Sequence, residues 1–210
     1  MSPDAFAAKF PRLYHVAWPQ ARARIRRDGL MSPAALVERE GLPRDVLLAP
    51  RAEITDLGGG MILNDNSPLN LAVLRRALPD SLSVEDWLGE LNRRVFLFPK
   101  EARARAFANA AAAAGKARDI WVFDTRGFAA AYLDRMDITP FNTGAAVRNA
   151  PLRDRTTFAP LAGLDFAEWR TRRQRSAGLA NPDNVTEVCV RGSAPGAANY
   201  AVEVIERPPV

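Results

Sequence analysis

The sequence predicts an α+β fold, in which strands and helices are mixed rather than alternating regularly. Several short segments rich in aromatic and β-branched residues have the composition of strands. Other segments begin at Ser-Pro pairs or are rich in alanine, and these have the composition of helices. The two kinds of segment do not follow the regular βαβ order of a parallel sheet, which favours antiparallel strands with helices around them.

The first elements begin and end at recognisable residues. Ser2 can cap a short helix whose first residue is Pro3. Glycine ends the next two helices, at Gly29 and Gly41, and the second of them repeats the Ser-Pro start. The elements expected here are a helix over residues 2–10, a strand over residues 13–17, and helices over residues 19–28 and 32–40.

The middle of the chain alternates between irregular and helical segments. Ser83 can cap a helix that carries Glu85 and Asp86 in its first turn, where acidic side chains are favourable. Before it, glycine, asparagine and proline interrupt any regular pattern. The elements expected here are an irregular loop with one short strand over residues 51–68, and helices over residues 68–78 and 83–92.

The second half of the chain contains most of the expected strands. Pro99 ends the first of them, and either Asp124 or Thr125 can cap the helix that follows the second. The expected strands are residues 94–98, 119–125, 186–190 and 199–206, of which the last two flank a Gly/Pro loop. The other expected elements are helices over residues 101–116, 126–134 and 166–175, and a turn over residues 139–146.

Length and composition bound the class of protein. A chain of 210 residues with 48% hydrophobic and 25% charged residues predicts one globular domain over residues 1–210. No apolar run reaches the roughly 20 residues that span a bilayer, and the N-terminus lacks the pattern of a secretory signal. A single cysteine, Cys189, cannot form an internal disulfide. These features predict a cytoplasmic protein with no membrane partner.

The net charge of +5 comes from arginine, since all but three of the 29 basic residues are arginine. Two clusters stand out, RARIRR at residues 22–27 and WRTRRQR at residues 169–175. One interpretation is a surface that contacts the phosphates of a nucleic acid. The other is a set of solvated helix faces, and net charge alone does not decide between them.

Several familiar sites are excluded by the sequence. The GGG at residues 58–60 is not followed by the lysine that a phosphate-binding loop needs. One histidine and one cysteine do not make a conventional zinc site, and no serine stands in a GxSxG motif. Asp124 follows a strand as a phosphoryl-transfer carboxylate would, but helix capping explains it more simply.

Three strand segments remain as candidates for a site. Period-two alternation places His15, the only histidine, on the face of its strand opposite Tyr14. Arg94 and Phe96 share one face of the next candidate strand. Glu187 lies on the face opposite Val188 in an otherwise apolar strand, and needs either an arginine partner or a cleft. Each residue also has a structural interpretation, as a partly buried side chain, an edge residue or an ion pair.

Taken in order, the segments LYHVA, RVFLF and TEVCV, with the helix ARIRRDGL after the first, resemble the ADP-ribosyltransferase superfamily, in particular the DarT-like enzymes. The chain is also similar to an uncharacterised group of bacterial proteins that carry NRRVF and FNTG segments. The resemblance covers most of the chain. It implies an ADP-ribosyltransferase-like split of two small β-sheets with peripheral helices, and a transferase that uses NAD.

The resemblance also implies roles for individual residues. Glu187 would be the catalytic residue that stabilises an oxocarbenium-like centre when the nicotinamide–ribose bond breaks. His15 would bind the adenosine ribose, with Tyr14 or Phe96 offering an apolar surface. Arg94 or Arg51 would contact the pyrophosphate. In such enzymes the acceptor can be nucleic acid, the setting a toxin or phage defence, and the partner a neutralising protein. RVFLF lacks the tyrosine of the DarT-like strand, which leaves an inactive relative open.

Two other hypotheses belong to different classes. The first is a noncatalytic basic domain that keeps the fold to bind nucleic acid or a protein. The second is a different small enzyme that uses Asp124 and the FNTG loop, residues 141–144, although Asn-x-Gly turn chemistry explains that loop without a function. Binding of NAD would separate the first hypothesis from the transferase.

Overall fold

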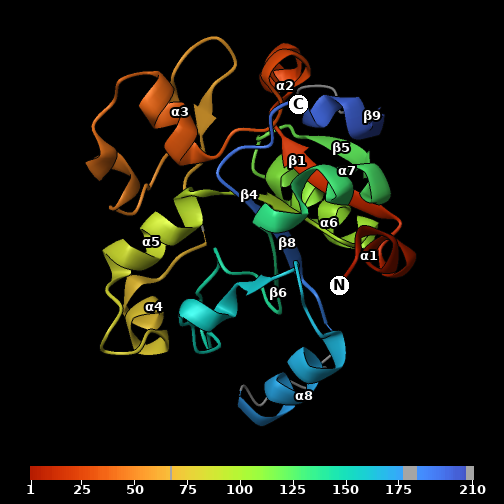
Figure 1. The fold of residues 1–210 in the computed structure, drawn as a ribbon. Helices are drawn as coiled ribbons and strands as arrows, with labels where there is room; N and C mark the ends of the chain where they lie inside the picture. Colours follow the sequence, from red (N-terminus) through yellow and green to blue (C-terminus); the bar gives the residue numbers. More distant parts are fainter. Residues whose placement is uncertain (67, 177–183, 207–210) are drawn as a thin grey trace.

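Two small antiparallel sheets form the centre of the protein in a computed structural model, which describes residues 1–66, 68–176 and 184–206, without the side chains of residues 172–176 (Figure 1). The first sheet has the order β1-β5-β9 and the second the order β4-β8-β6-β7. A single bridge between Tyr14 and Phe98 links them. The strands are β1 (Arg12–Ala17), β5 (Asp119–Asp124), β9 (Ala201–Ile205), β4 (Arg94–Leu97), β8 (Glu187–Arg191), β6 (Met136–Thr139) and β7 (Ala159–Pro160). The predicted α+β class is confirmed.

Helices cover the outside of the two sheets (Figure 1). Around the first sheet lie α1 (Pro3–Lys9), α6 (Glu101–Ala113) and α7 (Thr125–Tyr132). On the other side of β4 lie α3 (Pro33–Arg39), α4 (Leu71–Ala77) and α5 (Val84–Asn92). The other α-helices of the described chain are α2 (Arg22–Asp28) and α8 (Phe166–Ser176). Short 3₁₀ turns complete the chain: η1 (Pro19–Ala21), η2 (Arg44–Leu47), η3 (Leu133–Arg135), η4 (Arg155–Thr157) and η5 (Ala197–Tyr200).

The predicted helix starts are confirmed by their caps. Ser2 and Ser32 each accept a hydrogen bond from the backbone nitrogen three residues later, at 3.2 Å. Ser83 forms a reciprocal capping box with Asp86. Asp124 accepts from the nitrogen of Gly127 at 2.9 Å, so its role as a helix cap is confirmed. Each cap satisfies a backbone donor that the helix leaves unpaired.

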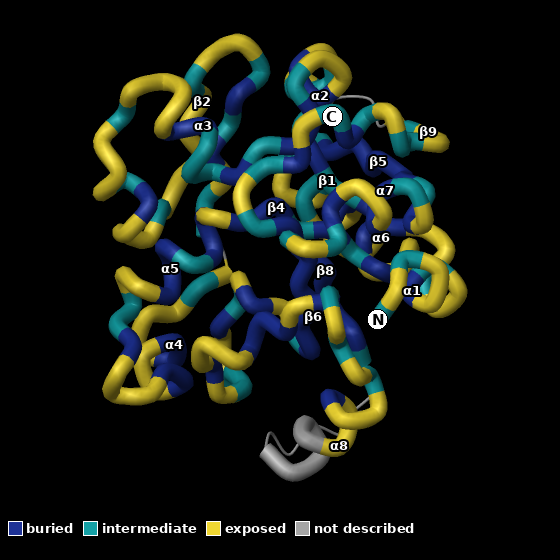
Figure 2. Tube along the Cα trace, viewed as in Figure 1, coloured by how far each residue is buried: buried dark blue, intermediate teal, exposed yellow. Residues whose placement is uncertain are grey.

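The alternation of side chains along the strands is also confirmed. Leu13 of β1 and Val188 of β8 lie in the main hydrophobic core. Tyr14 and Cys189, one position further along, belong to two other clusters on the opposite faces. Figure 2 shows buried residues running through the central strands, with exposed residues on the outer helices and loops. This alternation fixes which face of each strand meets the core.

Three strand regions differ from the prediction, and one of them is β7 at residues 159–160, where no strand was expected. The segment over residues 51–68 holds two short paired strands, β2 (Thr55–Asp56) and β3 (Ile62–Leu63), where one was expected. The strand β6 was not predicted at all. Its second residue is Asp137, which is 1% exposed because it pairs with Arg94 of β4 and Arg191 of β8. A buried carboxylate interrupts the apolar composition by which a strand is recognised in a sequence. The arginines that make its burial tolerable come from distant segments, so no local pattern indicates them.

Gly29, at the end of α2, is expected to tolerate no side chain. Its φ is +81°, and a Cβ there would lie 2.2 Å from the carbonyl oxygen of Ala194. Gly41 has a similar φ of +64° but open space around it. Gly41→Ala should cost about 1–2 kcal/mol of unfolding free energy from backbone strain alone. Gly29→Ala should cost about 1–3 kcal/mol more, because the chain must also move apart.

Urea unfolding of the two glycine variants and the wild type measures this difference directly. Equal losses for Gly29→Ala and Gly41→Ala would show that the contact between the end of α2 and residue 194 is not tight.

Candidate active site

A cleft of about 430 Å³ lies where β1 of the first sheet and β4 of the second separate. Beyond the Tyr14–Phe98 bridge the two strands form no further pairs among the described residues. Side chains from both strands, from the helices α2, α3, α5 and α6, and from several connecting loops line the space. Its size falls within the range of sites for small molecules and cofactors. His15, Arg94, Phe96 and Glu187 all line this one cleft.

His15 is held in a defined orientation by β4. Its Nδ1 lies 2.8 Å from the carbonyl oxygen of Phe96. A carbonyl oxygen only accepts, so Nδ1 carries the hydrogen and donates it. Burial lowers the pKa of His15, with the Phe96 hydrogen bond acting in the opposite direction. The neutral ring therefore keeps Nε2 as a hydrogen-bond acceptor for a ligand in the cleft.

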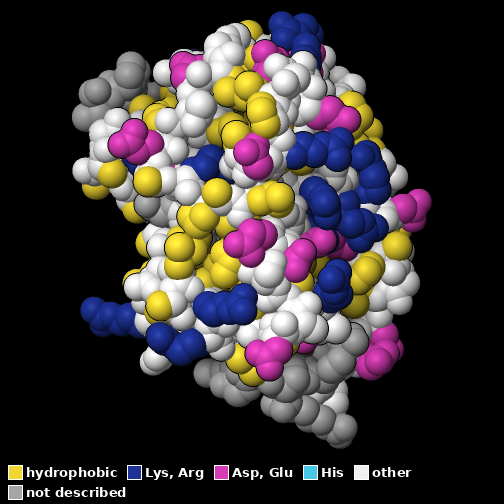
Figure 3. All heavy atoms as spheres, turned by 90° about the vertical axis from the view of Figure 1, so that its left-hand side faces the viewer, with side chains coloured by type: hydrophobic (Ala, Val, Ile, Leu, Met, Phe, Trp, Pro, Cys, Tyr) yellow, Lys and Arg dark blue, Asp and Glu magenta, His cyan; other side chains and the backbone are white. Residues whose placement is uncertain are grey.

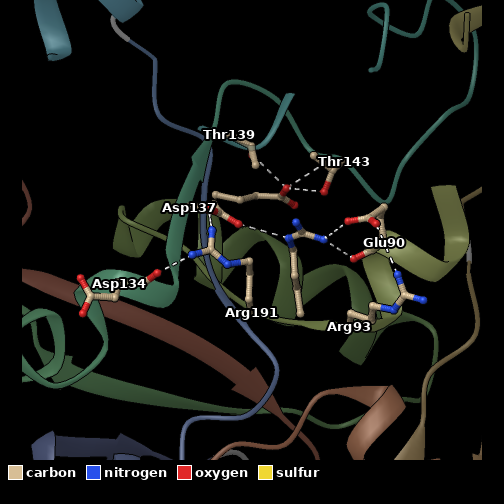
Figure 4. Close-up of polar contacts among 9 residues, drawn as sticks. Glu90, Arg93, Asp134, Asp137, Thr139, Thr143 and Arg191 are labelled. Atoms are coloured by element: carbon tan, nitrogen blue, oxygen red, sulfur yellow. Dashed lines mark hydrogen bonds and ion pairs between the residues drawn. The ribbon is translucent and has the colours of Figure 1, made fainter. Parts of the chain in front are cut away.

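Glu187, the first residue of β8, is anchored through one of its two carboxylate oxygens. Oε2 accepts from the Oγ1 and backbone nitrogen of Thr143, at 2.7 and 3.0 Å. The hydroxyl of Thr139 lies 3.1 Å from the same oxygen and 3.0 Å from the carbonyl of Phe141, so it serves one of them at a time. Figure 4 shows Thr139 and Thr143 pointing toward this carboxylate. Oε1 accepts no hydrogen bond from any residue described.

The anchored carboxylate is buried but not ion-paired. Glu187 is 6% exposed, and within the described chain no arginine lies at ion-pair distance from it. Of the two environments expected for Glu187, an arginine partner or a cleft, the structure shows the cleft, and two threonines bind the carboxylate. Burial raises the pKa of Glu187, and the hydrogen bonds from Thr143 and then Thr139 lower it. Within the described part of the chain, the carboxylate thus lines the cleft with Oε1 unbonded, and hydrogen bonds and the more distant Arg153 stabilise its charge.

The FNTG loop positions Thr143. The side chain of Asn142 accepts from the backbone nitrogens of Gly144 and Ala145, at 3.1 Å each, which closes a tight turn. Arg153 lies behind this loop and is 1% exposed. It donates to the carbonyls of Pro151 at 2.9 Å, Asn142 at 3.5 Å and Ala145. Turn chemistry therefore explains the loop's shape, and the loop in turn holds the carboxylate.

Arg94 lines the cleft but is already engaged by protein groups. It contacts Glu90 at 2.7 Å and Asp137 at 3.3 Å, and its Cζ lies 3.9 Å from the centre of the Phe158 ring. Figure 4 shows this network extending through Asp137 to Arg191. Burial raises the pKa of Asp137, and Arg191 and Arg94 oppose that rise. The charge of Arg94 is thus largely neutralised within the protein, which leaves little of it for a pyrophosphate.

Two residues assigned to the site from the sequence do not line the cleft. Arg51 donates to the carbonyls of Asn64 and Val46 and to the side chain of Asn92, so it ties a loop to α5. Tyr14 packs in the cluster that contains Ala104 of α6, on the opposite face of β1 from His15. Of the aromatic surfaces considered, Phe96 lines the cleft.

Most of the first arginine cluster is paired with acidic groups. Arg22 contacts Asp119 and Glu206, and Asp28 contacts Arg27 at 2.9 Å. The hydrogen bond from Arg27 is the largest cause that lowers the pKa of Asp28 to about 2. In the second cluster, the side chains of residues 172–175 lie outside the described part.

The face formed by α3, α4 and α5 carries Lys and Arg side chains among Asp and Glu, with hydrophobic side chains between them (Figure 3). Several exposed arginines of the described chain pair with acidic side chains, which reduces the positive charge that they present to a polyanion. Within the described chain, no helix is long and apolar enough to cross a membrane.

The structure adds residues that the sequence did not single out. Thr139 and Thr143 hold Glu187, and Arg153 holds the loop that carries Thr143. Of these residues, only Thr143 lies in a segment that the sequence made conspicuous, the FNTG turn. Trp18 and Arg118 also line the cleft, where the guanidinium Cζ lies 3.1 Å from the centre of the Trp18 ring. A cation and an aromatic ring 100 positions apart leave no local pattern.

Comparison with known proteins gives one family and no function. A family model described as a family of unknown function, DUF7002, matches residues 11–201. No curated protein matches the chain. The matched range runs from the residue before β1 to the first residue of β9, so it contains the whole cleft lining.

Proposed function

The chain belongs to the DUF7002 family, whose match covers nearly all of it, and we propose that this member is an NAD-dependent ADP-ribosyltransferase. One observation carries the proposal. His15 from the first strand and Glu187 from the late strand β8 line the same cleft, each with one hydrogen-bonding atom left for a ligand. The structure shows an α+β fold with two central sheets, and the specific ADP-ribosyltransferase-like arrangement of those sheets is part of the proposal.

In this mechanism His15 binds and orients NAD. Its Nε2 accepts a hydrogen bond from a hydroxyl of the adenosine ribose, while its Nδ1 stays bonded to Phe96. Phe96 and Phe98 supply apolar surface in the same cleft for a flat ring. Because the imidazole is neutral, it does not repel the positively charged nicotinamide ring.

Glu187 acts on the bond that breaks. Oε1 accepts from a hydroxyl of the nicotinamide ribose, and the negative charge stabilises the oxocarbenium-like centre as the C1′–N bond lengthens. The electron pair of that bond leaves with nicotinamide, which becomes neutral. A nucleophilic oxygen or nitrogen of the acceptor then bonds to C1′, and its proton passes to solvent water. We propose nucleic acid as the acceptor, on the resemblance to DarT-like enzymes.

Replacing His15 with alanine is expected to raise the KM for NAD by roughly 10-fold and to change kcat less, because the ring binds substrate away from the breaking bond. Nicotinamide release by the purified protein, supplied with NAD and mixed nucleic acids, measures both constants. Tyr14→Phe is the matched control on the opposite face of β1, and it should match the wild type.

Absence of nicotinamide release and of any mass shift on the acceptors would contradict the transferase. Stabilisation against heat by NAD is a second readout, because a ligand that binds only the folded state raises its apparent stability. Salt-sensitive binding of nucleic acid without any effect of NAD would favour the noncatalytic binding domain instead.

A further inference from the structure

Arg118, which directly precedes β5, is a buried cation with no carboxylate at ion-pair distance in the described part of the chain. It is 6% exposed and lines the cleft. Its guanidinium donates to two neutral acceptors, the carbonyl of Ala117 at 3.0 Å and the side chain of Asn64 at 3.4 Å. It makes no ion pair with any carboxylate among the described residues. Burial lowers its pKa to about 10, and the nearby charge of Asp65, which also lines the cleft, opposes that shift.

Trp18 and Asn64 fix the position of this guanidinium. The Cζ of Arg118 lies 3.1 Å from the centre of the Trp18 ring. The indole nitrogen of Trp18 donates to the side-chain oxygen of Asn64 at 2.9 Å, the same oxygen that Arg118 approaches. A guanidinium that lies over an aromatic ring keeps its edge donors for a planar or tetrahedral anion.

The other cations near this end of the cleft differ in how they are compensated. Lys116 pairs with Asp65, as Arg94 does with Glu90 and Asp137. Arg24 of α2 also lines the cleft, is 5% exposed, and lies 3.6 Å from Asp28. Its Nε and Nη2 have no hydrogen-bond acceptor among the residues that the structure describes. Two buried guanidinium groups on the cleft wall therefore lack full compensation, and an anion would supply it.

We propose that Arg118, supported by Trp18 and Asn64, is a phosphate-binding subsite of the cleft, whose lining also includes Arg24. The subsite takes a phosphate ester or diphosphate, and a nucleoside without phosphate gains nothing from it. It replaces Arg51 and Arg94, whose donors the protein already uses.

Strand register places this subsite away from Glu187. Tyr14 of β1 pairs with Phe98. The preceding residue, Leu97, pairs with Val188 of β8, so Phe98 lies opposite Glu187. Tyr14 and Glu187 therefore lie at nearly the same level along the strands. Trp18 is four residues further along the chain, about 13 Å at the usual rise of a strand. Arg118, with Asp65 near it, thus lies toward one end of the cleft, and Glu187 lies toward the other with His15 at nearly its level. A dinucleotide bent at its diphosphate fits this arrangement, with the diphosphate at Arg118 and the two riboses beside Glu187 and His15, an identification that rests on the proposed function.

Calorimetric titration of the whole chain tests the subsite with three probes: inorganic pyrophosphate, ADP-ribose and adenosine. We expect the wild type to bind ADP-ribose at least about 10-fold more tightly than adenosine, and to bind pyrophosphate measurably. Arg118→Gln should weaken ADP-ribose by about 10- to 100-fold and leave adenosine unchanged. Arg118→Lys keeps the positive charge but lacks the planar guanidinium. Its affinity for ADP-ribose should lie between those of the wild type and Arg118→Gln. Arg105→Gln, an exposed arginine of α6, is the control.

The outcomes separate the subsite from the proposed function. Equal affinity of the wild type for ADP-ribose and adenosine, or unchanged affinity in a folded Arg118→Gln, overturns the subsite. If Arg118→Gln does not fold, the wild-type comparison and Arg118→Lys still decide. Arg118-dependent binding of ADP-ribose without nicotinamide release supports the subsite and contradicts the transferase.

Discussion

Replacing Glu187 with glutamine is expected to lower nicotinamide release by at least about 100-fold, the usual loss when one preorganised electrostatic group is removed from a transition state. Glutamine has the same shape, and its carbonyl oxygen can still accept from Thr143 and Thr139. The loop and the cleft should therefore keep their structure, and the affinity for NAD should change little. Only the negative charge opposite the breaking bond is lost.

Glu203→Gln is the matched control, since it makes the same chemical change at an exposed position of β9. It should turn over NAD at the wild-type rate. Full activity of a folded Glu187→Gln would remove Glu187 from the mechanism, and with it the central argument for the transferase.

The same variant should alter the pH dependence of stability. The pKa of Glu187 lies above its usual 4.5 in the folded protein, because burial outweighs the hydrogen bonds from Thr143 and Thr139. Between those two pKa values the folded state binds more protons than the unfolded state, so stability falls as pH rises through this interval. Glutamine does not titrate, so this fall in stability is absent from Glu187→Gln. Urea unfolding from pH 4 upward should show the variant gaining stability relative to wild type, whereas a constant difference would contradict the buried, charged state.

Replacing Arg153 with methionine is expected to cost about 3 kcal/mol of unfolding free energy, because buried carbonyls lose hydrogen bonds from a charged donor. Arg153 donates to Pro151, Asn142 and Ala145, and it does not line the cleft. Loosening this loop should also displace Thr143 from Glu187. We therefore expect kcat to fall several-fold with little change in the KM for NAD.

Arg148→Met serves as the control, an exposed arginine close to the same loop. Arg153→Lys should restore part of both losses, since it keeps a cation behind the loop. If Arg153→Met is too unstable to assay, Thr143→Val removes the hydroxyl donor while leaving Arg153 in place, and it should lower kcat in the same direction. Wild-type kcat in both folded variants would show that the loop does not position the carboxylate.

Local sequence patterns accounted for most of the fold. Ser2, Ser32 and Ser83 were expected as caps and act as caps, because capping depends on residues within one turn of each other. Period-two alternation assigned the faces of β1 and β8 for the same reason. The strand β6 escaped prediction because Asp137 is tolerable in a sheet only beside Arg94 and Arg191, which arrive from two other strands.

The site was predictable only in part. A solitary histidine and a glutamate in an apolar strand are conspicuous, and both line the cleft. Arg51 looked available because its charge is visible in the sequence, whereas its acceptors are backbone carbonyls that only the folded loop brings near. Thr143 and Arg153 were not foreseen because a threonine becomes a carboxylate anchor only after the loop has closed.

The alternating faces of β8 limit how this protein can evolve. Val188 and Val190 lie in the main core, while Glu187 turns the other way to line the cleft. Deleting or inserting one residue in this strand would exchange the two sides, sending the acid into packed hydrocarbon and a valine into the cleft. Point substitutions remain open to β8, but descendants that gain or lose single residues there should be rare, while length changes accumulate in exposed loops.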